Sequence, residues 1–579
     1  MNAGPTPLRP RLGSVSVALA GSGGAGVMTA GNMLLEAAAQ AGYYSLMTRT
    51  SGPQIRGGEA AAMVRVCTFP TDAQDDRFEV LAAIDWQNVS RFAAEIPLGA
   101  GSLVIGDPTK GEPPEPFLKS GARFLPVPLH ALAKQIDGGW PNMVALGVLA
   151  GLMQLPADAV ERAVAKSMKK GKEAGISAAR LGMAQAASLE GFPLQPPPPK
   201  SGRWLITGNE AAGLGALRGG VRFVAAYPIT PATELLEYMA PALAKVGGTL
   251  VQAEDELASV NMILGASYGG APSLTATSGP GLSLMIEALG LGVTAEIPVV
   301  VVDVMRTGPS TGIATKSEQA DLNIAVYGLH GDAPHVVVAP NSLADCLAAT
   351  EWAVQLAESL QLPAIVLSDQ YFGQARAVVE APAGSNGSAA RILAISTSDK
   401  YKRYALTESG VSPMALPGTP GLAYTADGLE HNERGIPSSQ ASDHLAQMDK
   451  RARKLAQLDP GEHWASLEGA AGEGDIAVLT FGSCTGPVRE GIARARADGV
   501  AARLVSLRLL APAQPERLKR ALAGVKRVLV VEQNHSGQFL RYLRGEYELP
   551  GEVASLRRPG PLPFRPDEIH RRLMQWSGK

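Results

Sequence analysis

The chain has 579 residues, of which 46% are hydrophobic and 18% are charged, and its formal net charge is −2. At about 100–200 residues per domain, this length predicts about three or four domains, and the apolar content is enough for several buried cores. The near-neutral charge gives no bulk field that favours nucleic acid or an anionic membrane surface, so we expect neither as a partner.

The three cysteines, Cys67, Cys346 and Cys484, lie far apart, with no CxxC motif and no Cys/His cluster at metal-ligand spacing. They are too few to hold a [4Fe–4S] cluster by themselves, and no metal site is expected. A disulfide framework is not expected either, which favours a reducing cytoplasm. The N-terminal apolar run is short and enters a glycine-rich turn, which is typical of a strand and not of a signal peptide. No run of about 18 apolar residues predicts a membrane-spanning helix.

Residues 12–194 are predicted to form the first α/β domain. An apolar, β-prone run at 15–20 leads into the glycine-rich turn at 21–26, and a helical pattern continues to about residue 40. The glycines superficially match a dinucleotide fingerprint, but the acidic residue expected about 20 residues later is missing. Close packing of the helix on the strand is therefore favoured. A second loop at 51–59 could face a ligand or another subunit.

Four consecutive prolines within residues 195–202 favour an extended spacer and predict a domain linker. From 203 to 380, short β-rich runs alternate with helical stretches, which predicts a parallel sheet covered on both faces. Its strands are expected at 222–227, 249–253, 273–277, 298–304 and 364–367, and its helices at 231–245, 257–268, 282–291 and 343–359.

Residues 381–470 are rich in glycine, proline, serine and charge, and are predicted to form an irregular connecting segment that ends in a helix near 442–458. A third α/β domain is predicted at 471–579, with strands at 476–481, 502–506 and 527–531. The chain is thus expected to be a multidomain α/β protein.

The strongest functional signal lies in the middle domain, where a polar or glycine-rich loop follows each of four predicted strands. The loops are YPITP at 227–231, EDE at 254–256, TSGPG at 277–281 and RTGPSTG at 306–312. In open α/β sheets, ligands bind outside the carboxyl ends of the strands. We therefore expect the four loops to gather into one site.

Two of these loops offer groups that could hold an anion. Thr230 fits the N-cap of a helix that begins at Pro231, where free N–H groups could meet a substrate carboxylate, although a capped helix without a ligand has the same pattern. Arg306 follows a buried strand and can hold a carboxylate with two parallel hydrogen bonds, or can form a structural ion pair. The loop after Arg306 supplies hydroxyl groups and close backbone approach.

The three adjacent acids at 254–256 fit the positive end of a helix dipole, and this explanation is favoured for Glu254 and Asp255. Glu256 precedes an apolar run and should point into a buried interface. An acid in that position needs a partner that can take a hydrogen bond or a proton, such as the N1′ nitrogen of a thiamine aminopyrimidine.

In their order along the chain, these motifs resemble the α subunits of 2-oxoacid:ferredoxin oxidoreductases. The four loops carry the resemblance together with GNEA at 208–211. The run GSGGAGV at 21–27 and GPQIRGG at 52–58 resemble the γ subunit of that family, and VEQNHSGQ at 531–538 resembles the end of the α subunit. The γ-then-α order is most similar to the two-subunit 2-oxoglutarate enzymes.

The resemblance implies a γ-type domain, a pyrimidine-type thiamine diphosphate domain and a transketolase C-terminal-like domain. It implies an enzyme that converts a 2-oxoacid, in the first place 2-oxoglutarate, and coenzyme A to an acyl-CoA and carbon dioxide, with two electrons passing to ferredoxin. Pyruvate, indolepyruvate and branched-chain 2-oxoacids stay open as substrates, and so does a non-catalytic scaffold or CoA-binding role.

Thiamine diphosphate would bind between this chain and a separate β subunit, which in the family carries Mg²⁺ and a [4Fe–4S] cluster. The chain itself has no GDG diphosphate motif. The resemblance therefore implies that it is active only with the β subunit, in an expected (αβ)2 heterotetramer.

By position, Glu256 matches the glutamate that activates the aminopyrimidine in this family. Thr230 matches a residue that hydrogen-bonds the substrate, and Arg306 matches an arginine near the substrate carboxylate and coenzyme A. The resemblance assigns thiamine diphosphate to Tyr227, Pro228, Ile229, Glu256, Ser278 and Gly279, and substrate or coenzyme A to Thr230, Arg306, Thr307, Ser310 and Thr311.

Overall fold

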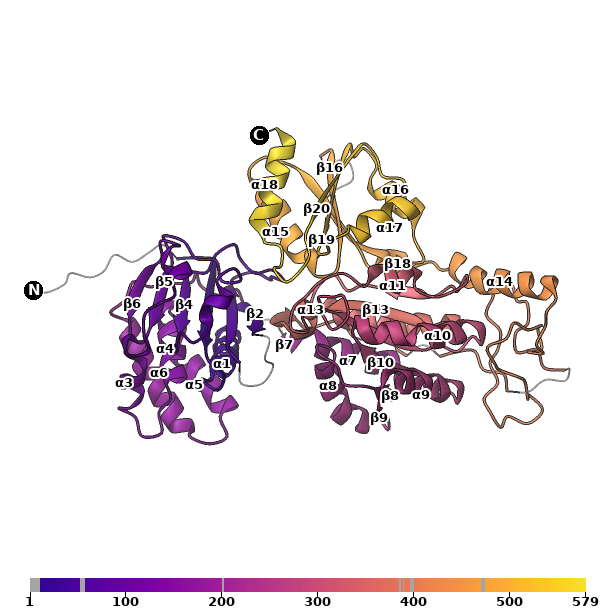
Figure 1. The fold of residues 1–579 in the computed structure, drawn as a ribbon, viewed down its shortest axis with the longest axis horizontal. Helices are drawn as coiled ribbons and strands as arrows, with labels where there is room; N and C mark the ends of the chain where they lie inside the picture. The colour runs from indigo at the N-terminus through magenta and orange to yellow at the C-terminus, as the bar shows by residue number, and fades with distance from the viewer. Residues whose placement is uncertain are drawn as a thin grey trace, which may run out of the picture. The chain divides into compact units, whose positions relative to one another are not determined.

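The computed structural model describes residues 11–52, 58–199, 202–384, 387–388, 390–395, 400–469 and 474–578. The chain forms two compact units, shown in Figure 1. The first consists of Met1–Thr207, Gln374–Pro382 and Phe564–Ile569, and the second of Gly208–Gly373, Ala383–Pro563 and His570–Lys579.

An eight-stranded mixed sheet organises the first unit. Its order is β6 (Arg123–Pro126), β5 (Leu103–Gly106), β4 (Val80–Ala83), β1 (Ser14–Gly21), β3 (Ala60–Cys67), β2 (Tyr44–Ser51), β14 (Arg376–Glu380) and β7 (Arg203–Thr207). Strand β1 is parallel to β4 and antiparallel to β3. Alternate residues of β1 face opposite sides, with Val15, Val17 and Leu19 in one hydrophobic cluster and Ala18 and Ala20 in another.

Helices cover both faces of this sheet. One face packs against α1 (Val27–Gln40), α3 (Leu129–Ala133), α4 (Pro141–Leu152), α5 (Ala157–Ser167) and α6 (Lys172–Ala186), and the other against the short η1 (Val89–Phe92) and α2 (Glu115–Leu118). A further short helix, η2 (Pro108–Lys110), follows β5.

Packing accounts for Gly26 of the first turn and for Gly31 of the helix that follows it. Gly26 has a φ of 79°, and a Cβ there would lie 2.3 Å from Asn142 Nδ2 in α4. A Cβ at Gly31 of α1 would lie 2.5 Å from the Ala62 Cβ in β3. Of the second predicted loop at 51–59, residues 53–57 lie outside the described residues, as do residues 200 and 201 of the predicted linker.

A seven-stranded sheet lies at the centre of the second unit. Its order is β18 (Leu509–Ala511), β12 (Val336–Val338), β13 (Ala364–Asp369), β11 (Val300–Met305), β10 (Ser273–Thr277), β8 (Phe223–Ala226) and β9 (Thr249–Gln252). From β12 to β9 all neighbours are parallel, as the alternating pattern predicted. The five predicted strands match the observed ones to within two residues at each end.

Two strands of this sheet were not expected. Strand β12 has only three residues, too few for a periodic signal. Strand β18 comes from the C-terminal part of the chain and pairs antiparallel with β12. A pairing between segments so far apart along the chain produces no recognisable pattern in the local sequence.

The helices associated with this sheet are α7 (Gly208–Gly219), α8 (Thr233–Ala244), α9 (Glu256–Tyr268), α10 (Gly279–Thr294), α11 (Leu322–Tyr327), α12 (Asp345–Leu360) and α13 (Gln370–Gln374). The prediction that Thr230 caps a helix beginning at Pro231 is wrong, because α8 begins at Thr233 with Ala232 in the N-cap position. Residues 230–232 form a separate turn. The Thr230 carbonyl instead accepts a hydrogen bond from Arg306.

Between β14 and α14 (Ala441–Ala456), the described residues form turns and isolated bridges. A cluster of buried charges, centred on Glu296, fixes this segment to the rest of the unit. The Glu296 carboxylate contacts Lys450, Lys454 Nζ at 2.8 Å and Arg403 Nη1 at 3.8 Å. Burial alone would raise the pKa of Glu296, but the three cations hold it well below its usual value.

A five-stranded sheet organises the C-terminal part of the second unit. Its order is β15 (Ala465–Glu468), β17 (Ala502–Leu507), β16 (Ile476–Phe481), β19 (Arg527–Glu532) and β20 (Glu552–Arg557), and only β15 is antiparallel to its neighbour. The remaining helices are η3 (Gly461–Trp464), η4 (Gly482–Cys484), α15 (Thr485–Ala497), α16 (Pro515–Ala521), α17 (Gln538–Glu546) and α18 (Pro566–Ser577). The predicted multidomain α/β class is confirmed. No helix in the described part of the chain combines the length and apolarity needed to cross a membrane.

Candidate active site

The four predicted loops lie at one edge of the seven-stranded sheet. Strands β8, β9, β10 and β11 end at Ala226, Gln252, Thr277 and Met305, and each is followed directly by one of the loops. Because these strands are parallel neighbours, their carboxyl ends meet at the same edge. The four loops therefore lie at the edge of the sheet where ligands bind in this fold class.

Glu256 is the first residue of α9 and is only 7% exposed. The residue before it, Asp255, caps the helix by accepting a hydrogen bond from the Ala258 amide at 2.7 Å. A Cβ at Gly281 would lie 2.7 Å from Glu256 Oε1, so the missing side chain lets this carboxylate approach α10. Among the described residues no group forms a hydrogen bond with the Glu256 carboxylate. The carboxylate is therefore left with capacity to accept a hydrogen bond from a ligand.

Arg306 follows β11 and is 7% exposed. Its Nη1 donates a hydrogen bond to the Thr230 carbonyl at 2.7 Å, while its buried Nε has no hydrogen-bond partner. Burial lowers the pKa of Arg306, and the nearby Asp321 opposes that shift. Arg306 forms no ion pair with any residue that the structure describes, so its guanidinium keeps donors for a ligand.

A cavity of about 810 Å³ lies beside Arg306 and is large enough for a cofactor-sized ligand. The predicted residues Gly279, Arg306, Thr307 and Ser310 line it. The other lining residues are Pro280, Ser283, Gly308, Pro309, Glu318, Ala320, Asp321, Asn323, Ile324, Asn534, His535, Ser536, Gln538, Pro559 and Gly560.

The C-terminal wall of this cavity was not predicted as part of the site. It is the loop after β19, which is held by Glu532: Asn534 Nδ2 and the Phe539 amide donate to its Oε2 at 2.6 and 2.7 Å. The Gln319 and Gln533 backbones also join this loop to the segment before α11, since the Gln319 amide donates to the Gln533 carbonyl at 2.8 Å. The available signal was the motif at 531–538, a polar loop directly after a predicted strand.

Three carboxylates were also missed, and they lie at the same end of the cavity. Glu318 and Asp321 line it, and Asp303, which is 0% exposed, lies behind them in β11. Both oxygens of Asp303 and Oδ2 of Asp321 are buried without a hydrogen-bond partner. A sequence signal existed for Asp303, because it is the one acid in a run of valines from 299 to 304.

The remaining predicted residues have different surroundings. Ser278 is fully buried, and its hydroxyl has no hydrogen-bond partner. The lining of the cavity does not include Tyr227, Pro228, Ile229, Thr230, Glu256, Ser278 or Thr311. Their assignment to thiamine diphosphate, substrate or coenzyme A stays a prediction.

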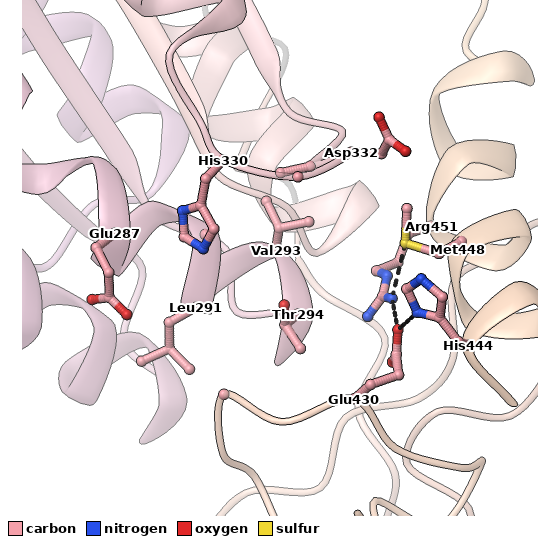
Figure 2. A pocket seen from close by; sticks show the side chains of 14 residues that line it. Glu287, Leu291, Val293, Thr294, His330, Asp332, Glu430, His444, Met448 and Arg451 are labelled. Atoms are coloured by element: carbon pink, nitrogen blue, oxygen red, sulfur yellow. Dashed lines mark hydrogen bonds and ion pairs between the residues drawn. The ribbon is translucent and has the colours of Figure 1, made fainter. Parts of the chain in front are cut away.

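A second cavity of about 380 Å³ contains none of the predicted site residues. Figure 2 shows His444 and Arg451 of α14 on either side of Glu430, whose Oε2 they contact at 2.6 Å each. Arg451 and His444 hold the pKa of Glu430 below its usual value against the opposing effect of burial. The polar groups at this end of the cavity are therefore mostly paired with one another.

Family models match three successive parts of the chain. Residues 16–185 match pyruvate ferredoxin/flavodoxin oxidoreductase, residues 214–450 match the thiamine-diphosphate-binding part of pyruvate flavodoxin/ferredoxin oxidoreductase, and residues 474–548 match core domain II of pyruvate:ferredoxin oxidoreductase. Together they indicate an oxidoreductase of the pyruvate:ferredoxin class.

Individual relatives are similar over nearly the whole chain. The α subunit of 2-oxoacid:ferredoxin oxidoreductase 2 of Aeropyrum pernix is 31% identical over 94% of this chain and 95% of its own length. The 2-oxoglutarate oxidoreductase subunit KorA of Mycobacterium tuberculosis is 31% identical over 98% of this chain and 92% of its own.

A solved structure is also similar to this chain over nearly its whole length. The 2-oxoglutarate:ferredoxin oxidoreductase from Magnetococcus marinus with 2-oxoglutarate, coenzyme A and succinyl-CoA bound is 35% identical, with a TM-score of 0.89 over 98% of this chain and 100% of that chain. This chain belongs to the α subunits of the 2-oxoacid:ferredoxin oxidoreductases, with the γ-type part fused at its N-terminal side. The resemblance stated from the sequence is confirmed.

Proposed function

We propose that this chain is the α subunit of an enzyme that converts 2-oxoglutarate and coenzyme A to succinyl-CoA and carbon dioxide and passes two electrons to ferredoxin. The observation that carries the proposal is the cavity beside Arg306, a buried arginine that forms no ion pair among the described residues and has a buried Nε without a hydrogen-bond partner. The choice of 2-oxoglutarate over other 2-oxoacids is supported by the Mycobacterium tuberculosis relative and by the 35% identical structure, whose names contain that substrate.

The residues at this edge of the sheet fit thiamine diphosphate. The buried Glu256 carboxylate has no hydrogen-bond partner in the described residues, and an aminopyrimidine nitrogen would provide one. Gly279 and Gly281 leave room for close approach along the first turn of α10, since a Cβ at either would meet a carboxylate oxygen within 2.7 Å. Thiamine diphosphate, when bound, supplies the carbanion chemistry that cleavage beside a carbonyl group needs.

In this proposal Glu256 shares a proton with the aminopyrimidine nitrogen, and its burial strengthens that hydrogen bond because little water competes for it. Arg306 binds the carboxylate of the oxoacid through the donors that Thr230 leaves unused. The hydroxyl groups of Thr307 and Ser310 lie on the cavity wall and can orient the substrate or coenzyme A. These side chains contribute position and charge, which is the usual share of the protein in a cofactor enzyme.

A partner subunit is supported by exposed apolar side chains next to Glu256. Leu257 and Met262 of α9 and Leu284 of α10 are 51%, 42% and 49% exposed. An apolar face of this kind is typical of a protein–protein contact. We propose that a β subunit covers this face and carries Mg²⁺ and the [4Fe–4S] cluster, in an (αβ)2 heterotetramer that reduces ferredoxin.

All three cysteines are buried thiols, and the described residues contain no group of three or more His, Cys, Asp or Glu side chains that could hold a metal ion. We further propose that residues 12–194 act as the γ-type domain, 203–380 as the thiamine diphosphate domain and 471–579 as the transketolase C-terminal-like domain. Residues 195–202 and 381–470 connect them.

Anaerobic co-expression with the β subunit tests the proposal. The purified complex, supplied with thiamine diphosphate, Mg²⁺ and coenzyme A, is assayed for reduction of an electron acceptor with 2-oxoglutarate, pyruvate or indolepyruvate in turn. We expect turnover with 2-oxoglutarate that requires both chains and coenzyme A. Preference for another oxoacid would overturn the choice of 2-oxoglutarate as the substrate. The absence of turnover from a complex with intact cofactors would overturn the catalytic role of the chain.

A further inference from the structure

The cavity beside Arg306 has an unfavourable charge for the anion that it is proposed to receive. Glu318 and Asp321 line this end, and Asp303 lies behind them. If these carboxylates were ionised, their negative charges would oppose an incoming anion, and that of Asp321 would lie near Arg306. A substrate carboxylate would then enter against a net repulsion.

The position of Asp321 shows that its side chain is not used for local structure. Asp321 occupies the N-cap position of α11, where an aspartate normally accepts a hydrogen bond from the backbone, but its side chain makes no capping bond. The carboxylate lies instead against α10, because a Cβ at Gly279 would be 2.6 Å from both of its oxygens. Oδ2 of Asp321 is buried and has no hydrogen-bond partner.

Asp303 approaches the same place from the sheet. It is opposite Thr277 in the parallel pairing of β10 and β11, and Thr277 is two residues before Gly279. Neither oxygen of Asp303 has a hydrogen-bond partner. Two interacting carboxylates that are buried without donors cannot both be ionised at low cost, so the protonated form of one of them is favoured.

The surrounding groups set the pH at which this proton is exchanged. Burial, with the nearby Glu318, raises the pKa of Asp321 to about 7, while Arg306 opposes the rise. Burial and the neighbouring Asp321 raise the pKa of Asp303 well above its usual value. Burial also raises the pKa of Glu318, which His535 and the Gly560 amide partly offset. Near neutral pH, the cluster of Asp303, Glu318 and Asp321 therefore exchanges a proton with solvent.

We propose that Asp321, backed by Asp303, is a positioning residue that couples binding of the substrate carboxylate at Arg306 to the uptake of one proton from solvent. The inference rests on the proposed function. When ionised, Asp321 acts as a counter-charge for Arg306 and repels an incoming carboxylate. When protonated, it leaves the donors of Arg306 to the ligand, and its own O–H can donate a hydrogen bond.

The first test is the pH dependence of KM for 2-oxoglutarate in the complex with its β subunit, between pH 6 and 8.5. For the wild type, KM should rise about tenfold per pH unit above neutrality, because one proton is bound with each substrate, and kcat should change much less. In Asp321→Asn, KM should stay near its low-pH value throughout. The matched control is Asp332→Asn, which removes an exposed acid that lines the second cavity. A KM in Asp321→Asn that follows the wild-type pH profile would overturn the inference.

A second test needs no turnover. An acid with a raised pKa in the folded state keeps a proton that the unfolded chain has lost, so stability falls as pH rises from about 4 to about 7. Asp321→Asn should reduce this loss, so that the Tm of the full chain falls less between pH 5 and pH 8 than that of the wild type. If Tm falls between pH 5 and pH 8 by the same amount in Asp321→Asn as in the wild type, the inference that Asp321 holds a proton in the folded chain is overturned. If the complex uses no oxoacid at all, the proposed function fails, and this measurement still decides whether Asp321 holds that proton.

Discussion

Two clusters of buried charges lie in the second unit of this chain, and they are built in opposite ways. Around Glu296, one carboxylate contacts three cations, Lys450, Lys454 and Arg403, whose side chains are all fully buried. Around Asp303 and Asp321, two carboxylates have unpartnered oxygens close to an arginine that forms no ion pair with the described residues. The first cluster fixes the irregular segment to the core, and the second lies at the cavity.

The two clusters show that burial and pairing together distinguish charges with a structural role from charges with a functional role. A buried charge without a partner is costly, so a fold that keeps one gains nothing from it unless a ligand or a proton completes the site. In the Glu296 cluster the counter-charges are already present. At the cavity, the unpartnered groups are the ones that a substrate, a cofactor or a proton would satisfy.

The largest effect is expected from Glu296→Gln, because it leaves three cations buried together without a counter-charge. We expect a loss of about 3–5 kcal/mol in the free energy of unfolding, measured by chemical denaturation of the full chain. Glu287→Gln, which changes an exposed glutamate of α10, is the matched control and should be close to neutral. Equal free energies of unfolding for the two variants would contradict the structural role of the Glu296 cluster.

The next effect is the loss of turnover in Glu256→Gln, which removes a proton partner and little volume. If Glu256 shares a proton with the aminopyrimidine, kcat of the complex should fall at least about 10²-fold, while its Tm stays close to that of the wild type. Glu254→Gln changes an exposed acid two residues away and should keep normal turnover. Near-normal kcat in Glu256→Gln, with the complex intact, would refute the assignment.

Arg306→Ala should weaken the use of the oxoacid or of coenzyme A. A hydrogen bond to a charged group is worth about 1.5–3 kcal/mol, so kcat/KM for one of the two substrates should fall about 10- to 150-fold. Arg306→Lys keeps the charge and loses the planar fork, and should recover only part of the loss. Unchanged constants for both substrates would exclude a contact between Arg306 and either of them.

The smallest effect is expected from Asp303→Asn, and its sign depends on pH. Because the pKa of Asp303 is raised in the folded state, ionisation opposes folding above the ordinary pKa of an aspartate. The neutral amide should therefore stabilise the chain by on the order of 1 kcal/mol at pH 8 and by much less at pH 4. Thermal unfolding at the two pH values checks this, and a variant that is less stable at pH 8 would contradict it.

The sequence was sufficient to predict much of the sheet that carries the site. Its parallel strands are short apolar runs bounded by turn residues, so periodicity located five of them to within two residues. The loops could be placed at one edge because parallel strands end on the same side. Arg306 and Gly279 were identified in this way.

What the sequence could not reveal depends on contacts between distant segments. Strand β18 joins a sheet more than a hundred residues away along the chain, and the loop of Asn534 and His535 completes a cavity begun by Arg306. The N-cap prediction at Thr230 failed because its carbonyl is engaged by Arg306 and a turn precedes the helix. The interaction of Asp303 in β11 with Asp321 at the start of α11 likewise depends on a contact between separate segments.

The most direct test is an experimental structure of the complex with its β subunit, prepared with 2-oxoglutarate and without coenzyme A. We predict that a carboxylate of the oxoacid lies within hydrogen-bond distance of the Arg306 guanidinium, in the cavity between Gly279 and Asn534. An oxoacid bound elsewhere, with Arg306 engaged only by the Thr230 carbonyl, would contradict it.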